Sequence, residues 1–226
     1  MTASAQREPS ISPRFQPDLI VETTMLCDRS CSGCYAPTIL ARRGSALPSD
    51  FLSLASLEGA LATLAPNLAD FAPVIAVRGG EPTLHPALLD LLSRLRQLTT
   101  NLYLETNGHW ILKEDEALLQ ICKQVGVIVK ISFDSMHTLK PHELHRACDK
   151  LDRNHVEWTV AITEATELAW HGTVTANQWL PLERAVFQPK AVDYTGLVKA
   201  SIAVIRPDGA ITSSVSMKTR FGRTQK

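Results

Sequence analysis

The sequence predicts an α/β protein built on a parallel sheet. Six short apolar segments alternate along the chain with segments of helical spacing, which is the pattern of repeated βα units. Strands that helices cover on both faces are almost continuously apolar, as these segments are. The 226 residues are 45% hydrophobic, which is enough for one sizeable domain with its own core. Periodicity leaves two architectures open, a doubly wound sheet and a barrel.

The first βα unit begins at residues 18–24, where the run DLIVETT predicts a strand. Residues 49–65 place leucines near helical spacing behind a polar Ser49/Asp50 pair that predicts the helix cap. The apolar run at 73–77 predicts the second strand.

The second and third units follow the same pattern. Residues 86–98 predict a helix that begins with a proline, and residues 101–106 predict the third strand. Residues 113–126 predict a helix with acidic residues in its first turn and Gly126 at its end. The apolar run at 127–133 predicts the fourth strand.

The remaining elements are less regular. Residues 141–154 predict the fourth helix and residues 156–162 the fifth strand. A poorly patterned crossover then leads to a short sixth strand at 186–189. Two alternating runs around a Pro-Asp-Gly turn predict a β-hairpin within 200–216.

Composition limits the classes of function. Twenty-three basic residues balance twenty-three acidic ones, so the charge favours neither nucleic acid nor a membrane surface as a partner. Residues 1–16 are polar, lack the apolar region of a signal peptide and predict a disordered leader. We expect a cytoplasmic protein with a core domain at 17–190, followed by a hairpin and a basic tail at 191–226.

Three of the five cysteines lie within eight positions, directly after the first predicted strand. Cys27, Cys31 and Cys34 form the pattern C-x3-C-x2-C. A structural zinc site needs four ligands, and the nearest further candidates, His85 and Cys122, belong to other units. Three thiolates suffice for a [4Fe–4S] cluster if one iron keeps a non-protein ligand. Such an open metal position is typical of a reactive site.

These motifs resemble those of the radical S-adenosylmethionine (radical SAM) enzymes. The cysteine pattern follows the first strand, and RGGEP at 78–82 ends the second strand, where the family has its GGE motif. The resemblance covers about residues 18–190. It implies an enzyme with a partial (β/α)6 TIM-like barrel, open on one side, a short C-terminal hairpin, and a [4Fe–4S] cluster whose unique iron is chelated by S-adenosylmethionine. One electron from the cluster then gives methionine and a 5′-deoxyadenosyl radical that abstracts hydrogen from the substrate.

The resemblance also implies which residues contact the cofactors. Cys27, Cys31 and Cys34 would ligate iron, and Gly79, Gly80 and Glu81 would receive the methionine amino group. The segments ETNG at 105–108 and SFDS at 132–135 are similar to those that line the ribose and the carboxylate. The further cofactor-binding candidates are Gly33, Tyr35, Thr106, Asn107, Ser132, Asp134, Ile162 and Phe187.

Two positions depart from the family pattern. Gly33 stands where an aromatic residue usually precedes the third cysteine, so stacking on adenine would fall to Tyr35 or Phe187. In the fifth strand, Val160 and Glu164 occupy positions where glycines are expected.

Other polar candidates have structural interpretations. Cys122 and Cys148 lie on apolar helical stripes and are expected in the core. Asp134 is either a ribose or substrate contact or a helix cap, and His137 is expected at the surface. Since no cysteine follows Cys148, we expect no auxiliary cluster.

The resemblance is strongest to the branch that contains peptide and cofactor maturases. It implies a peptide or protein substrate and an electron donor such as flavodoxin or ferredoxin. Two alternatives stay open: a radical SAM enzyme of small-molecule biosynthesis, and a non-catalytic partner subunit that keeps the fold.

Overall fold

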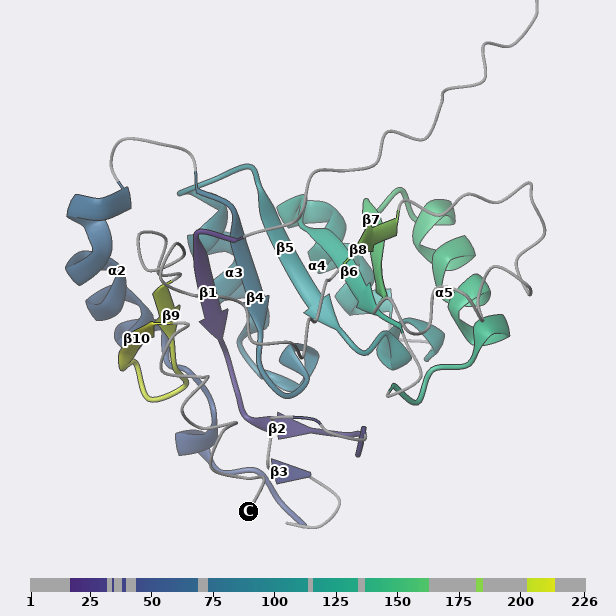
Figure 1. Ribbon diagram of the computed structural model, residues 1–226, viewed down its shortest axis with the longest axis horizontal. Coiled ribbons are helices and arrows are strands. Elements are labelled where there is room, and N and C mark those ends of the chain that lie inside the picture. The colour runs from purple at the N-terminus through teal and green to yellow at the C-terminus, as the bar shows by residue number, and fades with distance from the viewer. Residues whose placement is uncertain are drawn as a thin grey trace, which may run out of the picture.

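The protein was analysed as a computed structural model, which describes residues 17–31, 34, 38–39, 44–68, 73–113, 116–133, 137–162, 182–184 and 203–213. An eight-stranded sheet forms its centre (Figure 1). In sheet order the strands are β10 (Ile211–Ser213), β9 (Ala203–Ile205), β1 (Leu19–Glu22), β4 (Ile75–Arg78), β5 (Leu102–Thr106), β6 (Ile128–Ser132), β7 (Trp158–Ile162) and β8 (Leu182–Arg184). The α-helices are α2 (Leu54–Leu68), α3 (Leu88–Arg96), α4 (Glu116–Val125) and α5 (Pro141–Arg153).

In this sheet, strands β1, β4, β5, β6, β7 and β8 are parallel to one another. The sheet is not closed into a barrel. The prediction of an open, partial barrel of βα units is therefore confirmed. The sixth parallel strand, β8, lies within the segment that was expected to be a crossover, and so earlier in the sequence than predicted. The predicted strand at 186–189 lies outside the described residues.

One face of the sheet packs against the helices and forms the main core. Helices α3 and α4 lie behind the sheet in Figure 1, flanked by α2 and α5. Alternate strand residues such as Leu19, Val21 and Val77 join the leucines of the helices in one buried cluster. Residues of the opposite parity, including Ile20 and Ala76, form a separate small cluster with Val204 on the other face.

Two helix boundaries illustrate how local chemistry sets the elements. Helix α2 begins after Ser53, whose hydroxyl accepts a hydrogen bond from the Ser56 amide at 3.0 Å, so the predicted Ser49/Asp50 cap is wrong. Those two residues instead belong to the short 3-10 helix η1 (Pro48–Asp50). Gly126 ends α4 as predicted, with a φ of 71° and its amide donating to the Cys122 carbonyl.

The C-terminal hairpin is part of the main sheet. Strands β9 and β10 are antiparallel to each other, which confirms the predicted hairpin, and β9 pairs in parallel with β1. Gly209 at the turn has a φ of 81°, and a Cβ there would lie 2.9 Å from the Ser56 side chain. The hairpin is therefore seated closely against α2.

No helix within the described ranges is both long and apolar enough to cross a membrane.

Candidate functional site

The predicted motifs meet at the carboxyl ends of three neighbouring parallel strands. The cysteine loop follows β1, the Gly-Gly-Glu turn follows β4, and Asn107 follows β5. The two-residue strands β2 (Leu26–Cys27) and β3 (Thr38–Ile39) lie beyond the arrowhead of β1 in Figure 1. This is the edge at which open parallel sheets bind their ligands.

The Gly-Gly-Glu turn holds the start of the cysteine loop through backbone contacts. The Gly80 amide donates to the Thr24 carbonyl at 2.7 Å, and the Glu81 amide donates to the Leu26 carbonyl at 2.8 Å. A Cβ on Gly79, whose φ is 152°, would overlap the Thr24 carbonyl oxygen, and one on Gly80 would overlap that of Leu26. Both positions therefore require glycine, because the backbone of the cysteine loop leaves no room for a side chain.

The Glu81 carboxylate joins this turn to the next strand end. It is 2% exposed and accepts hydrogen bonds from Thr83, from the Thr106 hydroxyl at 2.8 Å, and from the Asn107 amide at 2.9 Å. Burial raises its pKa, while these donors oppose the rise. The described side chain is therefore a buried acceptor that binds two loops together.

Thr106 and Asn107 are both engaged with protein groups. The Thr106 hydroxyl, besides donating to Glu81, accepts from the Gly108 amide at 3.1 Å and from Trp110 Nε1 at 3.0 Å. The Asn107 side chain donates through Nδ2 to Asp28 Oδ1 at 2.9 Å, within the cysteine loop. Sequence reasoning missed Asp28, although an acidic residue inside the cysteine motif was a visible signal.

The three motif cysteines differ in exposure. Cys27 is buried, Cys31 is half-buried and Cys34 is exposed, with the Cys34 amide donating to the Cys31 carbonyl at 3.4 Å. Burial raises the pKa of the Cys27 thiol to about 11, with smaller contributions from Glu81 and neighbouring acids. Cluster binding would therefore displace a proton from this thiol.

The described residues fit an iron–sulfur cluster. They supply three thiols on one short loop, and two N–H groups point at Cys27 Sγ: the Arg29 amide at 3.4 Å and Asn107 Nδ2 at 4.0 Å. Within the described ranges, no three His, Cys, Asp or Glu side chains gather closely enough to hold a single ion. A cubane presents a separate iron to each thiolate, so its ligands stand further apart.

The other cysteines and His85 have structural roles. Cys122 and Cys148 are buried in the main core, where burial raises the pKa of each to about 12, as predicted for core residues. His85 Nε2 donates to the Leu52 carbonyl at 2.9 Å, and Nδ1 accepts from the Ala87 amide at 3.1 Å. Because both ring nitrogens are engaged, His85 is not placed as a metal ligand.

A row of alternating charges crosses the sheet beside the motif loops. Glu22 pairs in register with Arg78, and Glu105 with Lys130. The side chains form ion pairs, with Arg78 lying 3.8 Å from Glu22 and 3.9 Å from Glu105, and Lys130 lying 3.2 Å from Glu105. Arg206 from the hairpin also pairs with Glu22, whose side chain is fully buried. Sequence reasoning missed this row, because it depends on strand register.

The remaining predicted site residues are only partly described. Ser132 is half-buried at the end of β6, and Ile162 ends β7. His137 is half-buried, next to the undescribed segment 134–136. Four predicted contacts lie outside the described residues: Gly33, Tyr35, Asp134 and Phe187.

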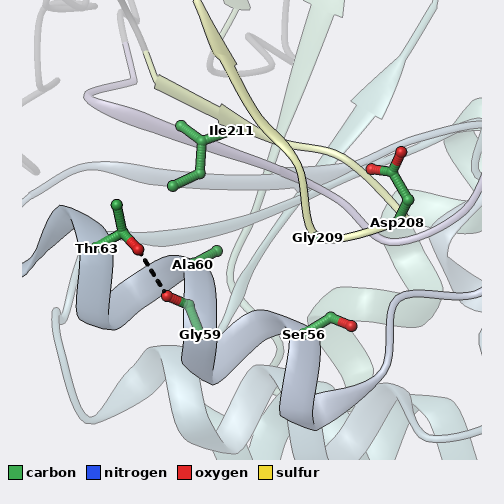
Figure 2. A pocket seen from close by; sticks show the side chains of 7 residues that line it. All are labelled: Ser56, Gly59, Ala60, Thr63, Asp208, Gly209 and Ile211. Carbon is green, nitrogen blue, oxygen red and sulfur yellow. Dashed lines mark hydrogen bonds between the residues drawn. The ribbon is translucent and has the colours of Figure 1, made fainter.

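A surface hollow of about 290 Å³ lies away from these motifs, between α2 and the hairpin turn (Figure 2). Ala60 and Thr63 line it from the helix, and Asp208 and Ile211 line it from the hairpin. None of its lining residues belongs to the cysteine loop, the Gly-Gly-Glu turn or the loop after β5. We interpret it as the seam between the hairpin and α2.

A family model that matches most of the chain includes the residues of this site. The family model described as "Radical SAM superfamily" matches residues 21–177, which include all three motif cysteines. Native anSMEcpe with bound AdoMet is 22% identical, with a TM-score of 0.46 over 64% of this chain and 43% of that chain. BtrN in complex with AdoMet and 2-DOIA is 17% identical, with a TM-score of 0.52 over 88% and 74% of the two chains. The search of curated proteins found no match.

An open parallel sheet with a three-cysteine loop after its first strand defines the class of protein. The chain belongs to the radical SAM superfamily. This confirms the predicted family and, with it, the cofactor pair that characterises the family, a [4Fe–4S] cluster and S-adenosylmethionine. The chain spans less than half the length of anSMEcpe.

Proposed function

We propose that this protein cleaves S-adenosylmethionine reductively and uses the resulting radical on a substrate bound at the carboxyl ends of its strands. The observation that carries the proposal is the direct hydrogen bonding of three motif loops. The Gly80 and Glu81 amides bind the cysteine loop, and Asn107 binds both Glu81 and Asp28. The loop that bears the thiols is thus fixed against the two strand ends that the family uses for its cofactor.

The chain's own residues would position the cofactors. Cys27, Cys31 and Cys34 would hold the cluster, and the turn at Gly79 and Gly80 would bring backbone groups next to the methionine end of the cofactor. When bound, the reduced cluster would supply one electron for the cleavage of S-adenosylmethionine to methionine and a 5′-deoxyadenosyl radical, which would take hydrogen from the substrate.

The substrate that we propose is a peptide or protein, and the electron donor a flavodoxin or ferredoxin. The open sheet supports a large substrate, because a barrel that is not closed leaves room for a peptide at its mouth. The row of charges from Glu22 to Lys130 lies on neighbouring strands, directly before the motif loops. The alternative proposal is that the same radical reaction acts on a small-molecule substrate.

Anaerobic reconstitution with iron and sulfide tests the function. After reduction with dithionite, S-adenosylmethionine should yield 5′-deoxyadenosine, measured by chromatography. Cys31→Ala should abolish both the visible absorption of the cluster and this product, because it removes a ligand. The matched variant Cys122→Ala should retain both, since Cys122 is 1% exposed within the core.

Each outcome separates the alternatives. A wild-type chain that binds a cluster but makes no 5′-deoxyadenosine would be a non-catalytic partner that keeps the fold. Stoichiometric zinc in place of iron would identify a structural metal site. Equal loss of cluster in Cys31→Ala and Cys122→Ala would show that the ligands are chosen wrongly. Deuterium transfer from labelled peptides or labelled small molecules into 5′-deoxyadenosine would then decide the substrate class.

A further inference from the structure

We propose that Asn107 is a positioning residue that raises the reduction potential of the cluster, by holding its side-chain amide against Cys27 Sγ and against Asp28. The inference rests on the proposed function, because Cys27 acts in it as a cluster ligand. It differs from the role implied by resemblance, in which Asn107 contacts S-adenosylmethionine. The described contacts of Asn107 join the turn after β4, the cysteine loop and the loop after β5.

The orientation of the Asn107 carboxamide is determined by its neighbours. The His109 amide can only donate, and it donates to Asn107 Oδ1 at 3.0 Å. Nδ2 must therefore face the opposite side, where it lies 2.9 Å from Asp28 Oδ1 and 4.0 Å from Cys27 Sγ. The Asn107 backbone is held as well, because its amide donates to Glu81 Oε2 at 2.9 Å. Little rotational freedom remains for this side chain.

An N–H group that faces a ligand sulfur favours the reduced cluster. Reduction adds negative charge, part of which resides on the sulfur atoms, and the positive end of the N–H dipole stabilises that charge. Cys27 Sγ faces two such groups, the Arg29 amide at 3.4 Å and Asn107 Nδ2. The Arg29 amide belongs to the backbone, so Asn107 is the donor that a substitution can remove.

Asp28 acts in the opposite direction. Its carboxylate is next to a cluster ligand in sequence, and a fixed negative charge there disfavours the added electron. The Asn107 Nδ2 group, 2.9 Å from Asp28 Oδ1, offsets part of that charge. Two cationic groups lie further from the carboxylate: Arg29 Nε at 3.7 Å and Lys113 Nζ at 3.9 Å from Oδ2. The side chain of Asp28 is 22% exposed, so solvent screens it only in part.

Two substitutions should therefore shift the potential in opposite directions. Asn107→Ala removes an N–H donor and leaves Asp28 less compensated, so the cluster should become harder to reduce. Asp28→Asn removes the negative charge and keeps an acceptor oxygen for Asn107, so the cluster should become easier to reduce. We expect about a tenfold change in the reduction equilibrium for each, which is ~59 mV for a one-electron couple.

The measurement is a potentiometric titration of the reconstituted full chain, followed by electron paramagnetic resonance without S-adenosylmethionine. Because that cofactor is omitted, a direct contact between it and Asn107 cannot contribute to the measured reduction potential. Asn154→Ala is the matched control, because it removes a carboxamide at the C-terminal end of α5, outside the motifs. Iron content and melting temperature are measured for every variant.

Opposite shifts in the two variants, with the control unchanged, would support the inference. Unchanged potentials, or shifts of the same sign, would overturn it. Should Asn107→Ala lose its cluster, Asn107→Ser, which also removes Nδ2 but keeps a polar side chain, decides by the sign of its shift. A wild-type chain that binds no cluster would instead defeat the proposed function, so the two failures are distinguishable.

Discussion

At the residue scale, His85 connects the turn after β4 to the segment before α2. Its Nε2 faces a carbonyl oxygen, which only accepts, so this nitrogen carries the proton. Its Nδ1 accepts from the Ala87 amide, so it has no proton. The bond to Nδ1 requires the neutral ring, which also packs edge-on against Phe51. Burial lowers the pKa of His85, and that of His109 in the same way.

These lowered values predict that acid destabilises the protein. Below a pH of about 6.5 the unfolded chain binds protons at His85 and His109 that the folded chain resists. The free energy of unfolding should therefore fall as pH drops through that value, until the lowered folded pKa is passed. Urea denaturation of the apoprotein between pH 7.5 and 5.5 measures this, and His85→Gln should flatten the slope. Identical slopes in both proteins would contradict the assignment.

At the scale of elements, the turn after β4 and the cysteine loop behave as one unit. The amides of Gly80 and Glu81 bind the carbonyls of Thr24 and Leu26, which start the loop. No side chain fits between them, because an added Cβ would meet backbone atoms that cannot rotate away.

Gly80→Ala should therefore damage both stability and the metal site. The added methyl group must displace the Leu26 carbonyl, at a cost of about 1–3 kcal/mol in the free energy of unfolding. Iron content after reconstitution should fall as well. Gly59→Ala is the matched control, since Gly59 lies exposed in α2 with no atom within 4 Å of an added Cβ. That control should stabilise by roughly 0.5–1 kcal/mol, and equal behaviour of the two variants would refute the argument.

At the scale of the whole molecule, the C-terminal hairpin extends the sheet beyond β1 and forms one of its edges. Strand β9 pairs with β1, and Arg206 from the hairpin pairs with the fully buried Glu22. The same carboxylate lies 3.8 Å from Arg78 in β4, so one acidic residue joins β1, β4 and the hairpin turn. Burying such a carboxylate costs free energy, and its ion pairs with the two arginines must offset that cost.

Arg206→Met should consequently destabilise the entire fold. Removing one cation from a buried pair costs about 3 kcal/mol, reduced here to the extent that Arg78 compensates. Lys150→Met is the matched control, because Lys150 pairs with Glu116, whose side chain is 62% exposed. Such a surface pair contributes roughly 1 kcal/mol or less. Chemical denaturation compares the two variants, and equal losses would argue against the importance of the buried pair.

The sequence predicted those features that depend on local pattern. The apolar strands, the cysteine loop and the glycine turn are each encoded within a few residues, and all were placed in the correct order. Contacts between distant segments were not predictable in this way. The bond from Asn107 to Asp28 and the row from Arg206 to Lys130 arise from strand register and loop packing. Strand β8 was misplaced because its three residues lack a clear alternation.

The parallel pairing of β9 with β1 bears on the order in which the protein forms during synthesis. Strand β9, one of the two neighbours of β1, is synthesised only after the five strands from β4 to β8 that lie between them in the sequence. Contacts so distant along the chain form slowly, because a long loop must close first. The nascent chain therefore exposes one edge of β1, beside the cysteine loop, until β9 has been synthesised.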